Sequence, residues 1–105
     1  MPESLSLVAI ITVRRAALAS FRAFETQAVR IMAEHGGRIE RTVVVAEDAQ
    51  PETIKEIHIV TFPDEAAFAA YRNDARLGPY AHLRAESVMH SEILVGTEGP
   101  VYSAG

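Results

Sequence analysis

The sequence has no cysteine and no tryptophan, and it has a single lysine, Lys55, among its ten basic residues. The absence of cysteine excludes disulfides, thiol nucleophiles and metal sites with Cys ligands. The net charge is −4 and the arginines are scattered along the chain, whereas a nucleic-acid-binding protein usually gathers its basic residues on one face. We therefore expect no nucleic-acid partner.

Long apolar runs are also absent, and a membrane-spanning helix needs about 20 apolar residues. Glu3 precedes the first apolar segment and Arg14 and Arg15 follow it, which reverses the charge order of a signal peptide. We expect a cytoplasmic protein with no membrane partner.

Apolar residues make up 49% of the 105 positions, which is enough for one compact domain. We assign residues 1–105 to that domain, with a core over about residues 5–96 and a terminal arm at 97–105. A core of this size is modest, so we expect a partner subunit to close part of the apolar surface.

Apolar periodicity predicts four strands and two helices. The predicted strands cover residues 5–14, 38–46, 54–62 and 88–95. A first helix is predicted at 16–35 and ends at Gly36-Gly37, and a second begins after Pro63 with Asp64 as its N-cap. The order β-α-β-β-α-β indicates an α+β, ferredoxin-like fold: a four-stranded antiparallel sheet, strand order 4-1-3-2, with both helices on one face.

The first helix has an apolar stripe that includes Phe21, Phe24 and Ala28, spaced three and four residues apart. Arg22 and Glu25 are charged and fall mostly off this stripe. We therefore predict that the stripe packs on the sheet and that these two charged side chains are exposed.

The first strand is apolar on both of its faces. Leu7 and Ile11 belong to one alternation class, and Val8 and Ile10 belong to the other. Because the helices cover only one face of the sheet, the second apolar face needs another cover. We predict a homodimer in which two sheets pack face to face.

Three segments resemble a known family in order and spacing. AEHGGRIERT at 33–42, IHIVTFPDEAAFAAYRND at 57–74 and PYAHLRAES at 79–87 resemble the corresponding turn, strand–helix and Tyr-x-x-x-Arg segments of the DUF1330 family. That family is similar to the antibiotic-biosynthesis-type monooxygenases of the dimeric α/β-barrel group. The resemblance implies the barrel fold and the homodimer, but it implies no particular reaction.

The candidate catalytic residues are His58, Tyr71 and Tyr80. His58 lies in the apolar segment Ile57–Val60, where a lone imidazole would be desolvated, remain neutral and act as an acid or base. The two tyrosines lie near the predicted seam between sheet and helices, where a phenol can donate a hydrogen bond to an oxygenated ligand. The alternative for all three is packing in the core with a satisfied polar atom.

Arg41 and His90 are candidate ligand-binding residues. An arginine can hold a carboxylate through two hydrogen bonds, and Arg38 and Arg41 are predicted to face opposite sides of their strand. His90 could add a polar group to the same cavity as His58. The alternative for these residues is a solvated strand edge.

We expect no metal and no cofactor. The sequence lacks HxH, HExxH and similar ligand spacings, and His58 and His90 would start about 10 Å apart on strands that are not neighbours. We therefore predict a small-molecule-handling protein that acts as a cofactor-independent enzyme on a small oxygenated or aromatic compound. The alternative is a non-catalytic binding or assembly protein whose dimer is the functional unit.

Overall fold

The computed structural model describes residues 4–45 and 50–104. The four strands are β1 (Leu5–Arg14), β2 (Arg38–Val44), β3 (Thr53–Phe62) and β4 (Val88–Thr97). They form one sheet in the order β2-β3-β1-β4, and every neighbouring pair is antiparallel. The predicted fold class and strand order are confirmed. Part of the predicted turn between β2 and β3, residues 46–49, lies outside the described residues.

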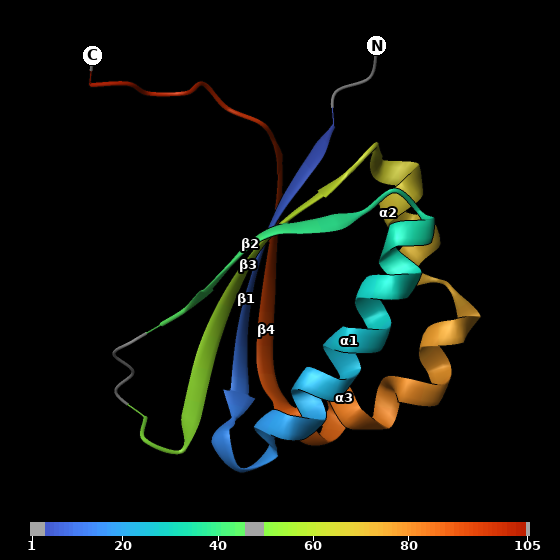
Figure 1. Cartoon of the computed structure of the whole chain (residues 1–105), viewed down its shortest axis with the longest axis vertical. Helices are drawn as coiled ribbons and strands as arrows, with labels where there is room; N and C mark the ends of the chain where they lie inside the picture. The colour runs from blue at the N-terminus through green and yellow to red at the C-terminus, as the bar shows by residue number, and fades with distance from the viewer. Residues whose placement is uncertain (1–3, 46–49, 105) are drawn as a thin grey trace.

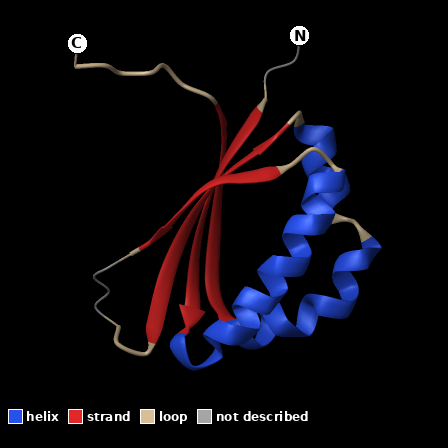
Figure 2. Cartoon of the chain, viewed as in Figure 1, coloured by secondary structure: helices blue, strands red, loops and turns tan. Residues whose placement is uncertain are grey.

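All helices lie on one face of the sheet (Figure 1, Figure 2). They are η1 (Arg15–Ala17), α1 (Leu18–Glu34), α2 (Glu65–Arg72), η2 (Ala75–Tyr80) and α3 (Ala81–Ser87). The region predicted as a second helix followed by a short helical turn thus contains two helices joined by the 3-10 segment η2, which includes Pro79. None of the helices in the described part of the chain is long and apolar enough to cross a membrane.

Helix α1 packs on the sheet through the predicted stripe. Phe21, Phe24, Ala28 and Ile31 are buried. The helix ends where Gly36 adopts a φ of 75°, a conformation that glycine accepts without steric cost. A Cβ on the following Gly37 would stand 2.3 Å from the ring of Phe62, so the chain turns into β2 at a point where only glycine fits.

Asp64 caps α2 as the sequence predicts. Its Oδ1 accepts a hydrogen bond of 2.8 Å from the backbone N–H of Ala67, which satisfies one of the free donors at the helix start. Phe68 on the next turn is buried and packs against Phe62 with ring centroids 5.2 Å apart. These contacts fix α2 over one end of the sheet.

The face of the sheet away from the helices, here called the open face, carries aliphatic side chains. Register places Val8 beside both Ile59 and Leu94, and Ile10 beside Ile57. Leu94 is 50% exposed, and the other four are half-buried because neighbouring side chains of the sheet shield one another. The described residues place no helix over this surface (Figure 1).

One detail of β2 differs from expectation. Its pairing with β3 shifts register between Ile39 and Arg41, which is typical of a β-bulge. Arg38 pairs with Thr61 and Arg41 pairs with Ile59, so both arginines lie on the open face. The prediction that they face opposite sides is wrong, because regular alternation is interrupted at the bulge.

Candidate functional site

A cavity of about 650 Å³ lies between the sheet and the helices, within the range of roughly 300–1,000 Å³ typical of ligand sites. Its walls are mainly apolar and come from all four strands and from α1, α2, η2 and α3. The polar groups on its walls include Glu25, His58, Tyr71, Arg84 and Ser91. The cavity thus combines apolar walls with a few polar groups.

His58 is 4% exposed and is held by a carboxylate on its own strand. Glu56 precedes it by two residues, so both side chains project toward the helices. His58 Nε2 lies 2.9 Å from Glu56 Oε1. Since a carboxylate only accepts hydrogen bonds, Nε2 carries the hydrogen and donates it.

The hydrogen bond to Glu56 leaves the second ring nitrogen of His58 facing the cavity. Across residues 4–45 and 50–104, no fully buried side-chain nitrogen or oxygen lacks a hydrogen-bond partner. The Nδ1 atom makes no hydrogen bond within that part of the chain, so it keeps accessible surface, and His58 lines the cavity. A neutral imidazole in this tautomer presents Nδ1 as a proton acceptor.

Glu56 in turn accepts a hydrogen bond from a side chain of α1. Its Oε2 accepts a hydrogen bond of 2.8 Å from Arg22. The prediction treated Arg22 as an isolated exposed charge and His58 as a lone ionisable group, and both views are incomplete. The imidazole of His58 therefore shares its buried surroundings with a carboxylate and an arginine.

Glu25 also lines the cavity, although it was predicted to be exposed. Burial is the main cause that raises the pKa of its carboxyl above the ordinary value, and the negative charge of Glu56 adds to it. Electrostatic interactions with His58 and Arg84 act in the opposite direction. The sequence contained a signal for this placement, since Glu25 follows Phe21 by four residues and precedes Ala28 by three.

Tyr71 reaches the same cavity from α2. Burial, with a smaller contribution from Glu25, raises the pKa of Tyr71 to about 12. The phenol therefore stays protonated at neutral pH and can donate a hydrogen bond. Arg84 on α3 donates to the hydroxyl of Ser91 at 3.0 Å, which places a positive charge at the cavity wall.

The other three predicted site residues lie apart from this group. Tyr80 does not line the cavity, whereas Gly78 and Ala81 on either side of it do. Arg41 pairs with Ile59 and His90 pairs with Thr12, so both face the open side of the sheet. The expectation that His90 contributes to the cavity of His58 is wrong, because the two side chains project from opposite faces.

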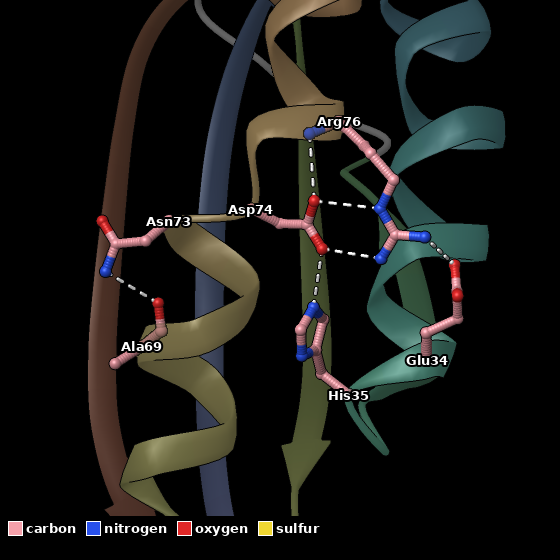
Figure 3. A network of polar contacts seen from close by, with 6 residues as sticks. All are labelled: Glu34, His35, Ala69, Asn73, Asp74 and Arg76. Carbon is pink, nitrogen blue, oxygen red and sulfur yellow. Dashed lines mark hydrogen bonds and ion pairs between the residues drawn. The ribbon is translucent and has the colours of Figure 1, made fainter.

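An ion-pair network fixes the cavity wall at the junction of α2 and η2 (Figure 3). Asp74 lines the cavity and accepts hydrogen bonds from Arg76 at 2.7 Å and from His35 at 2.8 Å. Arg76 also donates to Glu34 at 2.7 Å, and His35 and Glu34 lie at the end of α1. Hydrogen bonds from Arg76 and then His35 hold the pKa of Asp74 well below its usual range.

The described residues contain no group of three or more His, Asp or Glu side chains that could hold a metal ion.

No protein-family model and no curated protein matches the chain. Solved structures do match. The RPA0582 protein of unknown function from Rhodopseudomonas palustris has a TM-score of 0.74 at 13% identity, over 96% of this chain and 86% of that chain. SnoaB, a cofactor-independent oxygenase from Streptomyces nogalater, has a TM-score of 0.67 at 19% identity, over 95% and 97%.

A candidate antibiotic biosynthesis monooxygenase from Nitrosomonas europaea has a TM-score of 0.69 at 9% identity, over 93% of this chain and 92% of that chain. At these identities the likeness shows the fold alone. The chain has the same ferredoxin-like α+β fold as these structures, and the chemistry has to be argued from its own residues.

Proposed function

We propose that the cavity binds a small aromatic or oxygenated compound and that His58 Nδ1 accepts a proton from it in a reaction that needs no cofactor. The observation that carries this proposal is the hydrogen bond from His58 Nε2 to Glu56. It fixes the tautomer and leaves Nδ1 on the wall of an apolar cavity, which is the arrangement a general base requires. SnoaB, which shares this fold, is a cofactor-independent oxygenase, so the fold is compatible with a reaction that needs no cofactor.

Tyr71 supplies the hydrogen-bond donor of this proposal. Its phenol stays protonated and shares the cavity with His58, so it can hold a ligand oxygen while the proton is removed. A mostly apolar wall with few polar groups favours a planar, weakly charged ligand. The roles proposed from sequence for Tyr80, Arg41 and His90 have no support in the cavity geometry.

A second candidate function, assembly through a homodimer, is favoured by the open face. Aliphatic residues from β1, β3 and β4 lie side by side there without a cover from the described helices. A second sheet packed against them would bury a large apolar surface, of the size and character found in obligate interfaces.

We also propose membership of DUF1330 and a cytoplasmic location. Both rest on the sequence alone.

Ligand binding at His58 can be tested by thermal shift with 2-naphthol, a small aromatic hydroxy compound. A ligand that binds only the native state raises the apparent Tm. We expect 2-naphthol to stabilise the native protein and the control His82→Gln, an exposed position outside the cavity wall. His58→Gln keeps a polar group near Glu56 and should fold, but its response should be weaker. An undiminished response in His58→Gln would make His58 a structural residue.

A further inference from the structure

Glu25 is an ionisable group on the cavity wall that makes no hydrogen bond within the described part of the chain. Its carboxyl projects from α1, while His58 projects from β3 on the other side of the same space. By the reasoning used for Nδ1, its oxygens keep accessible surface. A ligand in the cavity thus meets a carboxyl group and an imidazole at the same time.

We infer that Glu25 and His58 act on one ligand as a proton donor and a proton acceptor, and that the ligand is a ketone with an acidic C–H next to its carbonyl. This inference rests on the proposed function and adds the second proton-transfer group and the class of ligand. Glu25 would be a catalytic residue, because its carboxyl touches the carbonyl oxygen.

The step balances without an oxidant or a reductant. The C–H bond next to the carbonyl breaks, and its proton goes to His58 Nδ1. The electron pair of that bond forms the C=C bond of the enol, and the π pair of the carbonyl moves onto oxygen. That oxygen takes the proton of the Glu25 carboxyl. The step leaves an imidazolium at His58 and a carboxylate at Glu25. Both groups return to their starting protonation states when the step runs in reverse.

The surroundings of Glu25 favour the protonated form of its carboxyl group. The groups that act on it are His58 and Glu56 from β3 and Arg84 from α3, and Tyr71 from α2 shares the cavity. The pKa of the Glu25 carboxyl is raised, mainly by burial, so the proton stays on Glu25 to a higher pH than on an ordinary glutamate. Arg22, on the same helix as Glu25, donates its hydrogen bond to Glu56 and not to Glu25.

Hydrogen exchange into 1-tetralone tests this pair directly. This aromatic ketone has one CH₂ group next to its carbonyl, and NMR in D₂O follows the loss of that proton signal. We expect the native protein to accelerate the exchange over buffer. Glu25→Gln and His58→Gln should each lower the protein-dependent rate by about a hundredfold or more, the lower end of typical general acid–base effects.

The matched control is Glu86→Gln, which removes the same charge at an exposed position of α3 outside the cavity wall and should exchange at the native rate. Because an amide hydrogen-bonds but does not transfer a proton, Glu25→Gln should still be stabilised by 1-tetralone. In the native protein the exchange rate should fall as pH rises through the raised Glu25 pKa, and this limb should be absent in Glu25→Gln.

The outcomes separate this inference from the proposed function. If 1-tetralone raises the Tm but exchanges at the buffer rate, or if Glu25→Gln exchanges as fast as the native protein, the inference is overturned and ligand binding stands. If 2-naphthol stabilises the protein and 1-tetralone does not, the ketone class is wrong. If neither compound stabilises the protein, both proposals fail.

Discussion

The two faces of the sheet carry the opposite of what their surroundings would suggest. The face covered by helices holds the buried ionisable pair Glu56 and His58, both 4% exposed. The open face instead carries Val8, Ile10 and Leu94. Buried charges have to be paired or serve a site, and an aliphatic surface without a cover marks an interaction site. This contrast underlies the proposals of ligand chemistry at the covered face and of contact with a second protein surface at the open face.

The largest difference expected between the faces is in folding stability. Phe21 is 1% exposed and packs with Ile11 and Val13 on the covered face. Phe21→Ala should lower the free energy of unfolding by about 3–5 kcal/mol, the usual range for a buried aromatic residue. Val29 lies on the same helix and is 39% exposed, so Val29→Ala should cost less than about 1 kcal/mol.

Urea unfolding at one fixed protein concentration gives both values, because a dimer makes apparent stability depend on concentration. Equal losses for Phe21→Ala and Val29→Ala would contradict the assignment of the buried face of α1.

The open face should control association instead. Ile57 lies near its centre, paired with Ile10 and Val43. Ile57→Asp would place an unpaired charge in an apolar interface, and we expect the dissociation constant of the homodimer to rise more than about tenfold. Light scattering over a concentration series should show a dimer for the native protein and a monomer for the variant.

Ser6→Asp is the control for this change, because Ser6 lies at the polar end of the same face beside Thr61 and Gly96. It should remain dimeric. A native protein that is monomeric at micromolar concentration, or an Ile57→Asp variant that stays dimeric, would exclude the sheet-to-sheet dimer.

A smaller effect is expected from the Asp74 network at the cavity wall. The pKa of Asp74 is lowered by Arg76 and His35, so its contribution to stability is present above the unfolded value, about 3.9, and is lost as pH falls through the lower folded value. The Tm difference between the native protein and Asp74→Asn should therefore be larger at about pH 7 than at about pH 2.

The exposed Glu65 on the neighbouring helix gives the control Glu65→Gln, for which we expect a small and nearly pH-independent difference. If the Tm difference for Asp74→Asn is the same at both pH values, the ion pairs seen at this junction do not contribute to stability.

The fold was predictable because local patterns and global packing agree. The apolar stripe of α1, the Asp64 cap and the Gly36-Gly37 ending each point to the same element boundaries. The bulge in β2 was not predictable, since nothing in the composition near Glu40 signals an extra residue in the strand.

The site was predicted only in part. His58 was recognisable as a polar residue in an apolar strand, and Tyr71 as a phenol at the seam. Glu56 could have been found by period-two alternation from His58, and Glu25 by its spacing from Phe21. The rule that charged side chains are exposed conceals both residues, because it does not apply to a buried carboxylate that is paired, as Glu56 is with Arg22 and His58, or to one that lines a cavity, as Glu25 does.

Methyl NMR can compare the two faces within one protein. Ile11, Ile39 and Ile93 line the cavity, whereas Ile10, Ile57 and Ile59 lie on the open face. On titration with 2-naphthol, we expect the methyl signals of the first three isoleucines to shift with a common saturation curve and those of the other three to stay in place. Shifts confined to the open-face isoleucines, or no shifts at all, would contradict the assignment of the helix-covered cavity as the ligand site.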